Sequence, residues 1–478
     1  MIQRSVLTVF VAAATFSSSA GDALAASRAQ ARQAHEGAAE AADAAAVEAL
    51  ARRAYIWGMP LVEAARIRER FTVQQGAGDV PPTPMNQFKH RRKLAGPEMR
   101  VGVGPNNDTI YSLAWVDLAD GPLVVTAPDF GSRYYTFSIN FADSSAEQSL
   151  GQRTHGGQLP PLFVHGPGYR GATPVGMVDV PSPTRYVNIA GRFLVRSADE
   201  YPEVNALQDQ LAIFRWYDWR AGRKVPAPES IARPLSRGPE GSPPALAFFH
   251  ELGAVLQDWV VRPEERAIVN DLRRIGITAR SGFRSEELTA ARRAALVRGF
   301  EKAREDVRAA SLHLGVERNG WTINYRGPRF GQDYLLRAAV AKDQIFVAVP
   351  EEAVYPIGRV DAQGQRLDGS HRYRIRFAPD ALPPVDAFWS ITAYDDTGFM
   401  IPNAIARYSV GDRTADLVKD ADGGITIELS ATPPASGGGN WLPVAPDAPF
   451  FLMMRLYRPR GDVLQQRWIP PAIERVPE

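Results

Sequence analysis

The sequence contains no cysteine, and this absence excludes several kinds of function. Thiolate nucleophiles and thiolate-bound metals both require cysteine, so neither occurs here. Disulfides are excluded for the same reason, and the folded chain must therefore depend on its hydrophobic cores alone. Attachment of a lipid to an N-terminal cysteine is excluded as well.

Strong net charge and the common catalytic motifs are also absent. The net charge is only +2, which gives no electrostatic reason to expect a nucleic-acid partner. The sequence has no Gly-x-Ser-x-Gly elbow, no Walker-type phosphate loop and no His-Glu-x-x-His zinc helix. Its seven histidines are scattered along the chain. We therefore expect no cofactor and no metal site, and the alternative is a metal bound by histidines that meet only in the folded chain.

Long hydrophobic runs are missing too, and the apolar run over residues 5–16 is too short to cross a bilayer. We expect no integral membrane span. Arg4 precedes this run, and Ala23-Leu24-Ala25 follows it as a small-x-small cleavage site. Residues 1–25 thus have the three parts of a secretory signal peptide, cleaved near Ala25, and predict a periplasmic or secreted protein. The alternative is an ordinary apolar N-terminal helix.

The rest of the sequence divides into four parts. Residues 26–45 are alanine-rich and polar without an apolar stripe, and predict a mobile lead-in. Residues 46–216 predict a helix followed by short strands in a β-sandwich domain. Residues 217–319 predict a proline-rich linker and a helical connector, and residues 320–478 a C-terminal β-sandwich domain.

Two local patterns predict particular helices. Apolar residues recur at helical spacing over residues 47–71, where Gly58-Met59-Pro60 predicts a kink or break before an end near Phe71. A second set at helical spacing predicts a helix over residues 203–214. The predicted fold is mainly β with a helical connector (α+β), with two β-sandwich or jelly-roll-like domains joined by helices.

Dispersed motifs resemble two known families. Gly104-Pro105-Asn106-Asn107-Asp108-Thr109-Ile110-Tyr111-Ser112 and Arg133-Tyr134-Tyr135 resemble the domain-of-unknown-function family 1254. Phe388-Trp389-Ser390-Ile391-Thr392 and Asn440-Trp441-Leu442-Pro443 resemble family 1214, which commonly follows it in tandem. The resemblance implies two β-sandwich domains joined through helices, often assembled as homo-oligomers, but no agreed reaction. The stretch FADSSAEQSLG after Asn140 departs from the family pattern.

The most promising candidate site is the segment around Asn106–Tyr111. Its asparagines and Asp108 suit turn formation and ligand contact equally, because Asx side chains readily bond their own backbone. For acid–base chemistry we select Asp108 as the carboxylate and His155 as the general base, although His155 also fits an exposed loop. Tyr111 and Arg133 are candidate oxyanion or orientation partners. The candidate ligand-binding residues are Asn106, Asn107, Thr109, Tyr135, Tyr394, Asp395, Arg407, Asn440 and Trp441.

These observations predict an exported protein that binds a polar small molecule or polymer in a cleft near Asn106–Tyr111. In its enzymatic form the protein is a cofactor-independent hydrolase. The alternative is a non-catalytic periplasmic binding or assembly module. Titratable groups that converge in one concave pocket would favour the enzyme, and a flat exposed apolar patch would favour the module.

Overall fold

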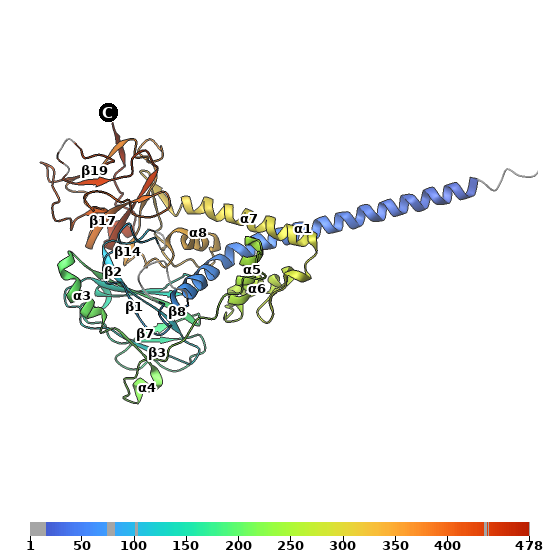
Figure 1. Ribbon diagram of the computed structural model, residues 1–478, viewed down its shortest axis with the longest axis horizontal. Helices are drawn as coiled ribbons and strands as arrows, with labels where there is room; N and C mark the ends of the chain where they lie inside the picture. The colour runs from blue at the N-terminus through green and yellow to red at the C-terminus, as the bar shows by residue number, and fades with distance from the viewer. Residues whose placement is uncertain (1–15, 74–81, 101–103, 435–436, 438, 478) are drawn as a thin grey trace, which may run out of the picture.

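The computed structural model describes residues 16–73, 82–100, 104–434, 437 and 439–477 (Figure 1). Residues 1–15, which hold most of the predicted signal peptide, lie outside the described residues. Sheets occur in both halves of the chain, and helices join the two halves. The predicted α+β class, with β-rich halves and a helical connector, is confirmed.

One long helix, α1 (Phe16–Thr72), opens the described chain. Its first half extends away from the rest of the molecule (Figure 1), and residues 27–43 are exposed. Alanine has the highest helix propensity, which accounts for helix where no packing supports it. The lead-in predicted over residues 26–45 is therefore helical, and its mobility stays a prediction. Buried apolar side chains begin at Val47.

Of the kink or break predicted at Gly58-Met59-Pro60, the break is wrong, because α1 continues through Pro60 to Thr72, and the kink stays a prediction. The predicted end near Phe71 is confirmed. Gly58 serves close packing here: a Cβ at this position would lie 2.7 Å from the Leu252 side chain. Proline removes only one donor from the helix, and the surrounding packing compensates for this loss.

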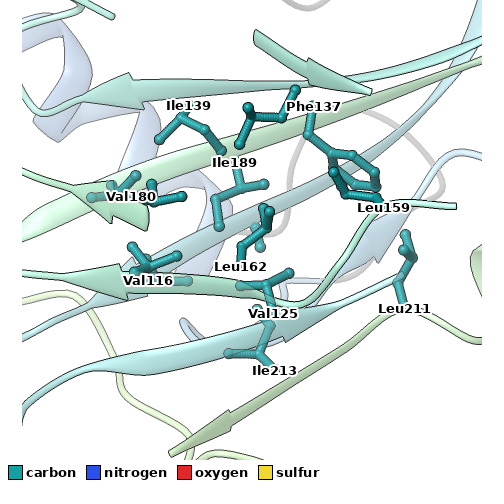
Figure 2. Close-up of a cluster of buried hydrophobic side chains, with 14 of the residues drawn as sticks. Val116, Val125, Phe137, Ile139, Leu159, Leu162, Val180, Ile189, Leu211 and Ile213 are labelled. Carbon is teal, nitrogen blue, oxygen red and sulfur yellow. The ribbon is translucent and has the colours of Figure 1, made fainter. Parts of the chain in front are cut away.

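The N-terminal half contains two sheets that enclose one apolar core (Figure 2). The first sheet has the spatial order β1 (Lys89–His90), β2 (Thr109–Asp117), β8 (Tyr186–Leu194), β4 (Tyr135–Phe141), β5 (Gln148–Gly151). The second has the order β7 (Val178–Pro181), β6 (Leu162–His165), β3 (Leu123–Thr126), β9 (Ala212–Arg215). The short helices of this half are α2 (Gln152–His155), α3 (Tyr201–Gln208) and α4 (Trp216–Arg220).

The helix predicted over residues 203–214 is only half correct. Helix α3 ends at Gln208, and residues from Ala212 onward form β9, which pairs with β3. Ile213 points into the core between the sheets (Figure 2). The apolar spacing in this stretch fits both periods, and pairing with β3 selects the strand.

The connector contains α5 (Pro244–Leu256), α6 (Arg266–Asp271), the hairpin β10 (Ile277–Thr278) and β11 (Gly282–Phe283), and α7 (Ala290–Leu312). These elements share a separate apolar core with the second half of α1, in which Trp57, Leu252 and Phe300 are buried. Helix α1 therefore packs with the connector as well as with the first sheet.

The C-terminal half repeats the arrangement of two sheets around one core. One sheet has the order β12 (Val316–Arg318), β13 (Trp321–Ile323), β15 (Ile357–Gly358), β21 (Phe450–Pro459), β17 (Val385–Asp395), β18 (Ser409–Gly411), with β14 (Ala353–Val354) on β21. The other has the order β20 (Trp441–Pro443), β19 (Ile425–Ser430), β16 (Arg372–Phe377), β22 (Glu474–Val476). Helices α8 (Tyr334–Gln344) and α9 (Gly461–Leu464) complete this half.

The two halves pack directly against each other. Tyr134 and Leu194 of the N-terminal half share an apolar cluster with Phe388 and Tyr457 of the C-terminal half. Strand β8 is buried along its whole length, because one face meets the core and the other faces α1 and the C-terminal half. Within the described part of the chain, no helix has both the length and the apolar character needed to cross a membrane.

Candidate functional site

The segment before β2 forms a turn whose side chains also reach the other half of the molecule. The Oδ1 atom of Asn106 accepts a hydrogen bond from the backbone N–H of Asp108 at 2.7 Å, which is an Asx turn. The side-chain amide of Asn106 donates to the hydroxyl of Tyr457 at 2.8 Å. Ser409 donates to Asn107 at 2.8 Å. Turn formation and side-chain contact therefore coexist in this segment.

Asp108 is only 4% exposed, and its carboxylate connects the two halves through hydrogen bonds. Arg413 donates to its Oδ1 atom at 2.8 Å, and Ser390 donates to its Oδ2 atom at 2.7 Å. Tyr457 donates to the same Oδ2 atom at 3.3 Å. All three donors come from the C-terminal half, so this carboxylate is already engaged by the protein itself.

Tyr111 and Arg192 are neighbours across the β2–β8 pair and project from the same face of the sheet. The Nε atom of Arg192 donates to the hydroxyl of Tyr111 at 3.1 Å. Its other nitrogens donate to Ser138 at 2.7 Å and to the carbonyl of Phe346 at 3.2 Å. Phe346 has a φ of 63°, a left-handed conformation that a bulky residue rarely adopts. The backbone that caps Arg192 is therefore strained.

Arg455, on β21 of the C-terminal half, is only 2% exposed. It donates to the hydroxyl of Tyr394 at 2.7 Å, to that of Thr392 at 2.9 Å, and to the carbonyl of Gly104 at 2.9 Å. Tyr394 in turn donates to the carbonyl of Pro105 at 2.6 Å. Arg455 thus reaches the same segment as Tyr111 from the opposite half.

We call these side chains the interdomain cluster: Asn106, Asp108, Tyr111, Arg192, Ser390, Tyr394, Arg413, Arg455 and Tyr457. The hydrogen-bond partners of Arg192 and Arg455 are hydroxyl and carbonyl oxygens. Among the described residues, no carboxylate lies within ion-pair distance of either guanidinium. Asp108 pairs instead with Arg413. The cluster therefore carries more positive than negative charge.

The charges of the cluster shift the pKa values of Tyr111 and Tyr457, the two tyrosines whose hydroxyls contact Asn106, in opposite directions. Burial alone raises the pKa of Tyr111, but Arg192, with Arg455 and the Asn106 amide, outweighs it and lowers the pKa below its ordinary value. Burial and the nearby Asp108 carboxylate raise the pKa of Tyr457 well above its ordinary value. Tyr111 is therefore the phenol of this pair that ionises first.

The structure leaves two predicted catalytic residues, Arg133 and His155, and the predicted ligand-binding residue Tyr135 outside the interdomain cluster. Arg133 pairs with Glu200 at 2.7 Å and with Glu203 at 3.0 Å. The ring of Tyr135 lies in the apolar core between the sheets. His155 lies in α2, where its Nδ1 atom is 2.7 Å from the hydroxyl of Thr154. Burial lowers the pKa of His155.

Of the candidates in the second half, Tyr394 belongs to the cluster and the others hold turns and strands together. Asp395 accepts from the backbone of Thr397 and Phe399 in a turn. Arg407 donates to the carbonyl of Trp441, and Asn440 bonds to the backbone of Val418 before β19 and of Thr426 within β19. In the first half, Thr109 is buried at the start of β2, where it accepts from Asn106.

Five members of the cluster are missing from the sequence-based prediction: Arg192, Ser390, Arg413, Arg455 and Tyr457. One signal could have indicated Arg192. It is the charged residue of the buried strand β8, and the period-two alternation places it on the face opposite the core. The others lie about 280 to 350 residues from Asp108, so no local pattern connects them.

The described part of the chain holds no group of three or more His, Cys, Asp or Glu side chains that could bind a metal ion. An open polar groove of about 710 Å³ lies at one edge of the C-terminal half, lined by residues such as Asp361, His371 and Arg475. None of its lining residues belongs to the interdomain cluster.

The fold and site define a two-lobed α+β protein with a buried polar cluster between its lobes. Comparison with known families then identifies both lobes. Residues 85–214 match the family described as a protein of unknown function (DUF1254), and residues 352–461 match the family described in the same words as DUF1214. The N-terminal half belongs to the first family and the C-terminal half to the second, as their motifs predicted.

Two crystal structures are similar to this chain. The VPA0106 protein from Vibrio parahaemolyticus is 25% identical, with a TM-score of 0.64, over 90% of this chain and 100% of that one. An uncharacterized protein from Burkholderia cenocepacia is 14% identical, with a TM-score of 0.44, over 92% and 96% of the two chains. No curated protein matches the sequence.

Proposed function

We propose that this protein binds a small polar molecule with an anionic group at the interdomain cluster. The observation that carries the proposal is the pair of buried guanidiniums, Arg192 and Arg455, which have only neutral hydrogen-bond partners. The Asp108 carboxylate acts on Arg455 only from beyond ion-pair distance. A buried charge without a contacting counterion costs several kcal/mol, and a bound carboxylate or phosphate offsets that cost. Burial of the cluster favours a small molecule over a polymer.

The geometry supports binding more directly than hydrolysis by Asp108 and His155. Asp108 accepts hydrogen bonds from three protein side chains, which leaves it poorly placed to accept a proton from a substrate. No hydrogen bond connects His155 with Asp108 or Tyr111 among the described residues. We therefore favour the non-catalytic binding module, which the sequence presented as the alternative.

Calorimetry of the mature protein with small anions tests this function. Acetate, hexanoate, gluconate and inorganic phosphate form the panel, and hexanamide is the neutral control. We expect at least one anion to bind, and Arg192→Gln and Arg455→Gln each to weaken it by about 10- to 100-fold, the value of a charged hydrogen bond. Hexanamide should not bind.

Arg133→Gln is the matched control, because Arg133 is equally buried but already paired with Glu200 and Glu203. This variant should keep the affinity of the wild type. If none of the panel binds, or if Arg192→Gln binds the same anion equally well, the proposed function is wrong.

We also propose that the protein is exported to the periplasm or secreted, which the signal-like residues 1–25 support. Expression of the full chain in a Gram-negative host, followed by fractionation and intact-mass measurement, checks this. The exported form should begin at Ala26, and Ala25→Lys should prevent the cleavage. Recovery of uncleaved protein from the cytoplasm would contradict export.

A further inference from the structure

The face of the first sheet that points away from its core is largely buried and carries many polar side chains beside the apolar Leu113 and Ala190. Alternation along β2, β8 and β4 places the following side chains on this face: Tyr111 and Trp115, Asn188 and Arg192, and Thr136, Ser138 and Asn140. Apart from the half-buried Tyr111, each of them is at most 7% exposed. A buried polar face is unusual, because each of its groups requires a hydrogen-bond partner.

The register arranges these side chains in rows across the strands. Tyr111, Arg192 and Thr136 form one row. Trp115, Asn188 and Asn140 form another, which we call the far row. Leu113 and Ala190 lie in the row between them, together with Ser138. Successive rows on one face are two residues apart, or about 7 Å. Arg192 leans toward the middle row, because it donates to Ser138 at 2.7 Å.

The far row contains polar atoms that find no partner in the protein. The indole N–H of Trp115 and the Oδ1 atom of Asn140 are both buried without a hydrogen bond. The amide of Asn140 makes only long bonds, at 3.3 Å to Asn188 and at 3.4 Å to a backbone carbonyl. Buried groups of this kind normally bond to a water or a ligand.

A donor and an acceptor in one row match a hydroxyl group. A hydroxyl oxygen can accept from the indole N–H of Trp115, and its hydrogen can be donated to the amide oxygen of Asn140. Arg192 lies two rows away, and its guanidinium, which reaches the middle row at Ser138, supplies the positive charge. We infer that the ligand is a hydroxylated organic anion, with its acidic group on Arg192 and a hydroxyl on Trp115 and Asn140. This inference rests on the proposed function and specifies its ligand class.

Three matched probes test the inference on the mature protein by calorimetry. Gluconate carries a carboxylate and a hydroxyl on every following carbon, so a hydroxyl reaches the far row whichever carbon lies there. Hexanoate has the same chain length without hydroxyls, and glucitol has the hydroxyls without the charge. Gluconate should bind at least about tenfold more tightly than either, the value of one well-made hydrogen bond to a buried group.

Two variants test whether the tighter binding of gluconate depends on the far row. Trp115→Phe keeps an aromatic ring but removes the N–H, and Asn140→Ser shortens the acceptor side chain. Each should lower the affinity for gluconate toward that for hexanoate, and should leave the affinity for hexanoate unchanged. Trp389→Phe is the control, because Trp389 is a buried tryptophan in the core of the other half. Thermal unfolding of each variant verifies that it is folded.

The failures of the two proposals can be distinguished. If gluconate and hexanoate bind equally and both depend on Arg192, the hydroxyl inference is wrong and the proposed anion site stands. If gluconate stays preferred in both Trp115→Phe and Asn140→Ser, the hydroxyl contact does not lie at the far row, and the inference is again wrong. If no anion depends on Arg192, both proposals fail together.

Discussion

Tyr111 is the side chain on which the charges of the site act most directly. Its hydroxyl accepts from Arg192 at 3.1 Å and from the Asn106 amide at 3.2 Å. Two donors on one phenol oxygen stabilise its ionised form more than its neutral form. If a proton is transferred at this site, the residue placed to accept it is Tyr111 rather than Asp108.

Ultraviolet difference spectroscopy measures this ionisation directly. Because Arg192, Arg455 and Asn106 lower the pKa of Tyr111, one tyrosine should titrate below the ordinary value of about 10. Tyr111→Phe should remove that step, and Arg192→Gln should move it to higher pH. Tyr457→Phe is the matched control and should retain the step, since the pKa of Tyr457 is raised. An unchanged early step in Tyr111→Phe would contradict the assignment.

At the scale of single elements, α1 changes character along its length. Residues 27–43 are exposed and helical by propensity, whereas the segment from Val47 onward is held by packing against α5 and α7. An isolated alanine-rich helix is only marginally stable in water, so the exposed part contributes little to the fold.

Two truncations separate the parts of α1. Deletion of residues 26–42 should change the melting temperature by no more than about 2 °C, because it removes no buried side chain. Deletion of residues 26–52 also removes Val47 and Leu50 from the core and should lower the unfolding free energy by about 3 kcal/mol or more. Thermal and urea unfolding give both values. Equal effects of the two deletions would show that the exposed part is structural.

At the scale of the whole molecule, one buried carboxylate joins three parts of the chain. Asp143 accepts from Arg337 of α8 at 2.8 Å and from Arg262 of the connector at 2.7 Å. Arg337 also donates to the backbone carbonyl of Trp57 in α1 at 2.9 Å. Asp143 lies in the stretch FADSSAEQSLG, which departs from the family pattern, so this departure occurs at a junction between parts of the molecule.

Acid unfolding tests this junction. Burial alone raises the pKa of Asp143, but Arg337 and Arg262 outweigh it and lower the pKa to about 2. Because the unfolded value is about 3.9, the stabilisation is complete above that pH and is lost as the pH falls from about 4 to about 2. Asp143→Asn should remove on the order of 2 kcal/mol of that pH dependence.

Urea unfolding at several pH values between 2 and 6 measures this contribution. Asp380→Asn is the control, because Asp380 is exposed and should leave the acid profile unchanged. Parallel acid profiles for the wild type and Asp143→Asn would mean that the carboxylate does not stabilise the junction.

Much of the fold could be predicted from the sequence because its signals are local. Strands β6 and β8 follow from β-branched runs between turn residues, and α7 from apolar spacing along a charged helix. The errors have a local origin too. At Gly58 a helix-breaking signal is outweighed by close packing against Leu252, and at Ile213 an apolar spacing that fits both periods is resolved by pairing with β3.

The candidate site could be predicted only in part. Asn106, Asp108 and Tyr111 lie in one short motif, so the sequence placed them together. Arg133 and His155 are close to that motif in sequence, but their side chains turn to Glu200 and Thr154 instead. Neither residue lies in a strand, because Arg133 precedes β4 and His155 ends α2, so the folding of these connecting segments decides where their side chains point.

The sequence by itself determined the α+β class, the two family halves and the turn at Asn106–Asp108, and it alone supports the export that we propose. Only the tertiary structure decided that the charges of Arg192 and Arg455 both act on Tyr111 and that neither arginine has a carboxylate within ion-pair distance. Spacing and periodicity act over a few residues, so they specify an element and its faces. The joint action of two arginines from different sheets on one tyrosine depends on how the two halves pack, which no local pattern contains.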